Sequence, residues 1–83
     1  MKVRYDKEID AIYFDLSVEQ KSVEQEEISD GVILDYDQDD NLIGIEVLDF
    51  ETKVSNGLTV NDLPFPEDKR VIARRWFNLP VSV

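Results

Sequence analysis

Five oxygen-bearing residues between positions 35 and 46 have the spacing of a calcium-binding loop. Calcium and magnesium bind where several carboxylate and carbonyl oxygens converge, and this spacing supplies such oxygens. Two features argue against a metal: Asp40 stands where the loop's sharp turn calls for glycine, and the flanking runs resemble strands rather than helices. Acidic residues are common in turns without metal, so we expect no bound metal or cofactor. The candidate ligands are Asp35, Asp37, Asp39, Asn41 and Glu46.

Three carboxylates are expected on one face of a sheet, where paired acids could exchange protons. Asp15, Asp35 and Glu46 share one phase of the strand alternation. Paired carboxylates act as general acid and base when their surroundings separate their pKa values. The sequence supplies no companion electrophile, and its lack of Cys and His removes thiolate and imidazole chemistry. A partly solvated polar face is the simpler interpretation, and we name no catalytic residue.

Short strands joined by polar turns must position these side chains. Val, Ile and aromatic residues alternate with polar ones in several runs, and Asp, Asn and Gly fill the segments between them. The pattern predicts a mainly-β α+β domain: an antiparallel β-meander of about five strands with a short C-terminal helix packing on one face. The third strand is so polar that it suits an edge. The predicted strands are residues 2–5, 11–16, 22–28, 32–36 and 42–48.

One face of this sheet is predicted to be apolar and must be covered by another element. The cover is expected from a C-terminal extension, residues 55–83, which follows a β-meander domain at residues 1–54. Within the extension, residues 58–60 could add a short strand. Residues 67–78 predict a helix, with a strand as the alternative because Val, Ile, Trp and Phe also favour strands. The apolar face comprises Val3, Tyr5, Ile12, Phe14, Leu16, Val32, Leu34, Tyr36, Ile43, Ile45 and Val47.

The opposite face also carries apolar residues, with Gly44 leaving room between strands. Contiguous exposed apolar area usually marks an interaction site, so the chain's own tail or a second chain is expected there. Residues 67–83 hold two acids and four bases, whereas residues 1–66 hold seventeen acids and five bases. A basic tail docking on an acidic body, within one chain or in a homodimer, follows from this asymmetry. The candidate partner-binding residues are Tyr13, Ile33, Leu42, Leu48, Trp76 and Phe77.

The net charge of −10 limits the classes of partner. A protein with this negative charge repels nucleic acid and anionic membrane surfaces, and it attracts a basic protein. No apolar run is long enough to span a bilayer, and no signal peptide is evident. With no cysteine, a cytoplasmic location is expected.

Four strings carry a family resemblance: Lys2-Val3-Arg4-Tyr5-Asp6, Asp10-Ala11-Ile12-Tyr13, Asp30-Gly31-Val32-Ile33-Leu34-Asp35-Tyr36-Asp37 and Leu42-Ile43-Gly44-Ile45-Glu46-Val47-Leu48-Asp49. With them, the chain resembles domain-of-unknown-function family 2283, small bacterial proteins, over residues 1–54. The resemblance implies a compact β-rich domain and no established catalytic residues. Members of this family are often encoded beside other very small proteins, so the resemblance also implies an antitoxin-like role. Residues 55–83 extend beyond the family pattern.

The sequence therefore favours a non-enzymatic protein-interaction module that binds itself, a basic protein partner, or both. An antitoxin-like module would bind a small basic toxin, with surface acids steering association. Two alternatives stay open: a metal-dependent or carboxylate-based small enzyme, and an acidic mimic of DNA. The candidate steering acids are Glu24, Glu26, Glu27, Asp37, Asp39 and Asp40.

Overall fold

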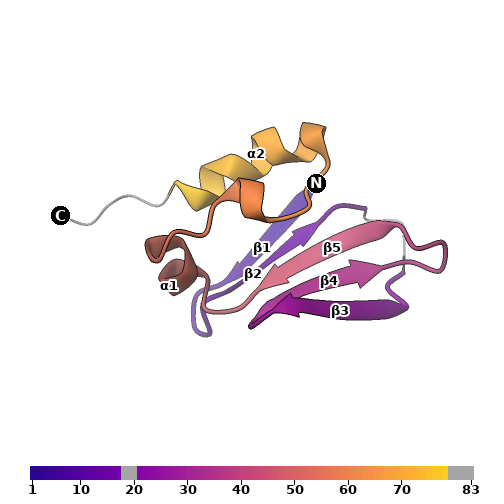
Figure 1. Ribbon diagram of the computed structural model, residues 1–83, viewed down its shortest axis with the longest axis horizontal. Helices are drawn as coiled ribbons and strands as arrows, with labels where there is room; N and C mark the ends of the chain where they lie inside the picture. Colours follow the sequence, from indigo (N-terminus) through magenta and orange to yellow (C-terminus); the bar gives the residue numbers. More distant parts are fainter. Residues whose placement is uncertain (18–20, 79–83) are drawn as a thin grey trace. The chain divides into compact units, whose positions relative to one another are not determined.

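A computed structural model describes residues 1–17 and 21–78 of the 83-residue chain (Figure 1). The chain divides into two compact units, Met1–Phe50 and Glu51–Val83. The division follows residue 50 rather than residue 54, and residues 79–83 of the expected extension lie outside the described residues. Within the described ranges, no helix has the length and apolar character needed to cross a membrane.

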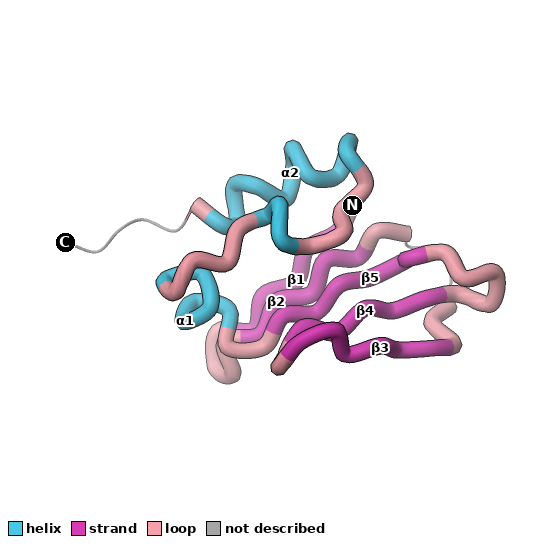
Figure 2. The backbone as a smooth tube through the Cα atoms, in the orientation of Figure 1, coloured by secondary structure: helices cyan, strands magenta, loops and turns pink. Residues whose placement is uncertain are grey.

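The first unit is a single five-stranded antiparallel sheet in the order β1-β2-β5-β4-β3 (Figure 2). Strands β3, β4 and β5 follow one another as a meander, and the β1–β2 hairpin joins this meander along β5. The chain therefore passes from β2 to the opposite edge before β3 begins. This confirms the mainly-β α+β class and the edge position of the polar third strand. The strands are β1 Lys2–Asp6, β2 Ala11–Asp15, β3 Glu24–Ser29, β4 Val32–Tyr36 and β5 Leu42–Val47.

The turns use residues that tolerate a positive φ. Gly31 (φ 74°) closes the β3–β4 hairpin, and its N–H donates to Glu27 Oε2 at 2.9 Å. Asp10 and Asp40 adopt φ values of 52° and 62° at the β1–β2 and β4–β5 turns. Short polar side chains visit this region more readily than branched or bulky ones, which explains the Asp-rich turn composition.

One face of the sheet forms the core of the first unit, as the alternation predicts. Val3, Leu16 and Tyr36 are half-buried on this face, and Tyr5 is exposed at the β1 edge. Phe50 is buried, and its ring meets that of Tyr5 edge-on at 6.4 Å between centroids. The buried members of the predicted apolar face are Ile12, Phe14, Val32, Leu34, Ile43, Ile45 and Val47.

The second unit contains short helices. Helix α1 (Phe50–Ser55) crosses the boundary, 3₁₀ turn η1 (Val60–Asp62) follows, and α2 (Glu67–Phe77) is the longest. The structure therefore settles residues 67–77 as helix. The short strand expected at residues 58–60 is wrong, because Asp62 Oδ2 accepts a 2.7 Å hydrogen bond from the N–H of Thr59 and closes a 3₁₀ turn.

The buried side of α2 contacts the segment that precedes the helix. Ala73 is fully buried, and the Phe77 ring meets Phe65 edge-on at 6.3 Å. Arg70 Nη2 also donates to the carbonyl oxygen of Phe65 at 3.0 Å. These contacts fix which side of α2 faces inward and leave its other side exposed.

Candidate functional site

A tyrosine–aspartate hydrogen bond crosses the central strand on the polar face of the sheet. Tyr13 on β2 donates its phenol O–H to Asp35 Oδ2 on β4 at 2.6 Å, although β5 lies between the two strands. Gly44 stands opposite Asp35 in the β4–β5 register. A Cβ built on Gly44 would collide with Tyr13 Oη and would lie 2.6 Å from Tyr13 Cζ. The missing side chain is therefore what lets the ring cross β5.

The hydrogen bond belongs to a row of side chains that spans all five strands. Gln25 on β3 donates through Nε2 to Asp35 Oδ1 at 2.7 Å, so both oxygens of this buried carboxylate accept a hydrogen bond. At the other edge, the Arg4 guanidinium lies over the Tyr13 ring, 4.9 Å from its centroid, in a cation–π contact. We call Arg4, Tyr13, Gly44, Asp35 and Gln25 the cross-sheet row.

The row holds Tyr13 as a neutral hydrogen-bond donor. Burial raises the pKa of Tyr13 well above its usual value of 10.0, and the hydrogen bond to Asp35 and the negative charges of Asp35 and Asp15 raise it further. Arg4 opposes this shift. A phenol held neutral in this way donates to a carboxylate, so the row ties β2 to β4 over the top of β5.

The five candidate metal ligands do not converge. The Asp35 carboxylate belongs to the cross-sheet row, whereas Asp37 turns back on its own loop. Asp37 Oδ1 accepts from the N–H groups of Asp39 at 2.8 Å and Asn41 at 2.9 Å, and its Oδ2 accepts from Asn41 Nδ2 at 3.2 Å. Glu46 stands on β5. Across residues 1–17 and 21–78, no group of three or more acids is placed to hold a metal ion.

Asp37 organises the β4–β5 turn. The backbone hydrogen bond from Asn41 is the main reason that its pKa lies below the usual 3.8, with smaller help from Asn41's side chain and the Asp39 backbone; burial opposes the shift. Because Asp37 is only 2 % exposed and its carboxylate is hydrogen-bonded within the turn, it is poorly placed to steer a partner. Asp39 and Asp40 in the same loop are exposed and keep that role.

The three candidate carboxylates lie on the polar face as expected. Gly44 has Asp15 on one side and Asp35 on the other in the strand register, and Glu46 stands between Tyr13 and Ile33. Asp35 is the one whose partners are fixed by the row. The sequence pattern drew attention to Gly44 but could not reveal the tyrosine that crosses it, nor the roles of Arg4 and Gln25.

The candidate partner-binding residues have different surroundings. Trp76 is 36 % exposed on α2, whereas Phe77 is 8 % exposed and packs on Phe65. Phe77 is thus a core residue of the second unit, because the α2 helix turns neighbouring positions to different sides. The other four candidates, Tyr13, Ile33, Leu42 and Leu48, are half-buried.

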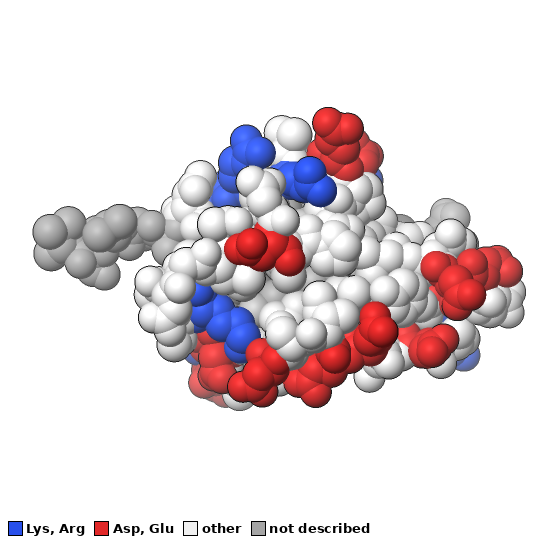
Figure 3. All heavy atoms as spheres, viewed as in Figure 1, with Lys and Arg blue, Asp and Glu red and all other residues white. Residues whose placement is uncertain are grey.

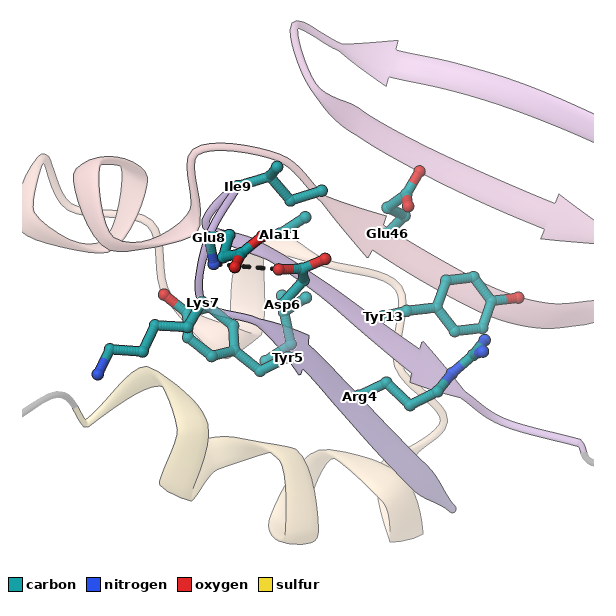
Figure 4. A pocket seen from close by; sticks show the side chains of 10 residues that line it. Arg4, Tyr5, Asp6, Lys7, Glu8, Ile9, Ala11, Tyr13 and Glu46 are labelled. Carbon is teal, nitrogen blue, oxygen red and sulfur yellow. Dashed lines mark hydrogen bonds between the residues drawn. The ribbon is translucent and has the colours of Figure 1, made fainter.

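A hollow of about 620 Å³ opens at the β1–β2 turn (Figure 4). The side chains of Ala11 and Tyr13 line it, and Ile9, 64 % exposed, stands at its edge. Asp6 ends β1 and Glu8 lies in the turn, and Asp6 Oδ1 accepts from the Glu8 N–H at 3.0 Å. The hollow therefore combines apolar surface with carboxylates. Glu46 lines it from β5.

Strand β3 forms an exposed acidic edge. Every residue of β3 is exposed, and the edge strand carries Glu24, Glu26 and Glu27. Acidic side chains gather along β3 and around the loop at residues 37–41 (Figure 3). Glu24, Glu26, Tyr36 and Asp40 line a depression of about 240 Å³. We call the exposed acids Glu24, Glu26, Glu27, Asp39 and Asp40 the acidic edge.

Comparison with known proteins identifies a family but no activity. Residues 2–50 match the family described as protein of unknown function (DUF2283). No curated protein and no solved structure shows significant similarity to the chain. The matched residues are almost the whole sheet unit, including the cross-sheet row, the hollow and the acidic edge.

Proposed function

The chain belongs to the family of proteins of unknown function DUF2283, so we propose a function from its own surface: a non-enzymatic interaction module whose acidic edge binds a basic protein partner. The observation that carries the proposal is β3, an edge strand exposed at every residue and bearing three glutamates. Asp39 and Asp40 extend this charge beyond the strand. Such a one-signed surface raises the encounter rate with an oppositely charged partner.

The acidic edge favours side-chain contacts over strand addition. Charges on an edge strand discourage another strand from pairing with its backbone. Beside Glu24, Glu26 and Asp40, the ring of Tyr36 supplies an aromatic surface in the depression. An aromatic ring among carboxylates suits a lysine or arginine side chain, which is attracted by charge and by the ring face. The partner is therefore expected to present exposed basic side chains.

Neutralising two glutamates tests the proposal. The immobilised protein would capture a partner from cell lysate, and the purified partner would then be tested at several salt concentrations. Glu24→Gln with Glu26→Gln should lower the association rate by about tenfold at low salt and weaken its salt dependence, with a smaller effect on dissociation. Gln has the same size as Glu and keeps one acceptor oxygen, so the substitution removes the charge with little change in shape.

A matched pair in the other unit provides the control. Glu67→Gln with Asp68→Asn also removes two negative charges, but from the first turn of α2. If both pairs of substitutions lowered the association rate equally, a role for the acidic edge would be contradicted, and the net charge of the protein would explain the effect. Capture of a small basic protein in fixed ratio would support the antitoxin-like form of the proposal. Competition by duplex DNA for the captured protein would instead favour DNA mimicry.

A further inference from the structure

The outward side of α2 carries apolar residues that its own unit does not bury. Val71, Ile72 and Trp76 are 68 %, 46 % and 36 % exposed. Ile72 and Trp76 are four residues apart, so their side chains are neighbours on the helix surface. Arg74 and Arg75 are exposed on the same helix. Trp and Arg are among the residues enriched where protein interfaces concentrate their binding energy.

The hollow at the β1–β2 turn has the complementary character. Ala11 and Tyr13 supply apolar and aromatic lining, and exposed Ile9 adds apolar surface at the edge. The acidic residues Glu8 and Glu46 also line it. A hollow lined in this way can accept a large aromatic side chain and pair with a cation beside it.

The two basic residues of the hollow leave its acids available. Arg4 lies over the Tyr13 ring in the cross-sheet row. Lys7 is exposed at the turn, and in Figure 4 its side chain extends away from Glu8 and Glu46. The unit around the hollow has fifteen acidic residues and four basic ones, whereas α2 has two acidic and four basic residues. The charges of the two surfaces are therefore opposite.

We infer that the hollow receives Trp76 from α2 of a second copy of this chain, with Arg75 of that copy facing Glu8 and Glu46. In a two-fold dimer each copy gives its α2 and receives its partner's. The contact then occurs twice, so each half supplies only part of the roughly 1,200–2,000 Å² that stable interfaces bury. The acidic edge takes no part in this contact and remains available to a different partner.

The single tryptophan provides a direct readout of the dimer. Trp76 is the chain's only Trp, so its fluorescence reports this residue alone. We expect the mass to rise from 9.6 kDa to twice that value with concentration. Over the same range the emission should shift to the blue and acrylamide quenching should fall. A protein that stays monomeric at every concentration would overturn the inference. So would a blue-shifted Trp76 emission that does not change with concentration, because it would indicate docking within one chain.

A charge exchange tests the pairing itself. Glu46→Arg and Arg75→Glu should each raise the dimer dissociation constant at least tenfold, and the two together should recover most of the loss. Asp39→Arg makes the same charge change in the β4–β5 loop and should leave the dimer unaffected. Glu8→Arg repeats the test at an exposed turn, in case Glu46→Arg unfolds the sheet. A dimer unchanged by Trp76→Ala, or charge variants that fail to compensate, would overturn the inference.

Discussion

Replacing Gly44 with alanine should destabilise the sheet through Tyr13 rather than through the backbone. Gly44 is buried, and no positive φ is required of it. Alanine would therefore suit the strand itself and would stabilise it by about 0.5–1 kcal/mol over glycine. Against this, the new Cβ would lie 2.6 Å from Tyr13 Cζ and 3.2 Å from Cε2. The ring must move, because β5 backbone atoms cannot.

The expected cost follows from what the displaced ring loses. The 2.6 Å hydrogen bond to Asp35 would break, and a hydrogen bond to a charged group contributes about 1.5–3 kcal/mol. Overpacking a close contact costs ~1–3 kcal/mol before relaxation, but displacing the Tyr13 ring relieves most of that cost, so only a small part of it adds to the lost hydrogen bond. After subtracting the gain in strand preference, we expect Gly44→Ala to lower the free energy of unfolding by about 2 kcal/mol. For a chain of this size that corresponds to a fall in Tm of roughly 8–16 °C.

A double-mutant cycle separates the ring from the backbone. Unfolding in urea, followed by far-ultraviolet circular dichroism, gives the free energy for Gly44→Ala, Tyr13→Ala and the double variant. With the ring absent, Gly44→Ala should become neutral or stabilising, giving a coupling energy of about 2–3 kcal/mol. Tyr13→Phe is the matched control, because it removes the hydroxyl and its hydrogen bond but keeps the ring carbons, which the new Cβ would still approach to 2.6 Å and 3.2 Å. If Gly44→Ala were equally destabilising beside Tyr13→Ala, the steric argument would be refuted.

Two further predictions concern pH. The folded-state pKa of Tyr13 is raised, so the stability it contributes is complete below pH 10.0 and is lost as pH rises beyond that value. A pH titration followed by tyrosinate absorbance should show Tyr13 ionising at a higher pH than an ordinary phenol. The Tyr13→Phe variant should lose less stability in alkali than the unaltered protein. The folded-state pKa of Asp37 is lowered, so its contribution is complete above pH 3.8 and is lost as pH falls through the folded value. Asp37→Ala should lower the urea midpoint of unfolding at pH 7, and the midpoint of the variant should fall less steeply as the pH is lowered. A midpoint at pH 7 equal to that of the unaltered protein would contradict the turn-forming role.

Local patterns in the sequence were sufficient to predict the strands. Val32–Tyr36 begins and ends where the alternation and its Asp-Gly turn place it, and β3 is the exposed edge that its glutamates suggest. Alternation also selects the right face for the core, because a strand sends successive side chains to opposite sides. These features depend on residues that are neighbours in the sequence, so they can be predicted from a single sequence.

The cross-sheet row depends on the order of strands, which alternation does not specify. Tyr13 reaches Asp35 only because β5 lies between β2 and β4 and has no side chain at Gly44. The Asp37 loop shows the same limit: calcium-like spacing describes which oxygens recur, but not that the Asp37 carboxylate accepts hydrogen bonds from the backbone of Asp39 and Asn41. Phe77 and Trp76 are adjacent in sequence, and helical geometry alone separates them into buried and exposed side chains.

The strand order also has a consequence for how the sheet is assembled. The β1–β2, β3–β4 and β4–β5 pairs are hairpins that close over short turns, whereas β2 and β5 pair residues as distant in sequence as Ile12 and Val47. Loop-closure entropy grows with the length of chain enclosed, and contacts between distant residues slow folding. The two locally formed pieces therefore meet along β2 and β5, and the hydrogen bond from Tyr13 to Asp35 spans that junction.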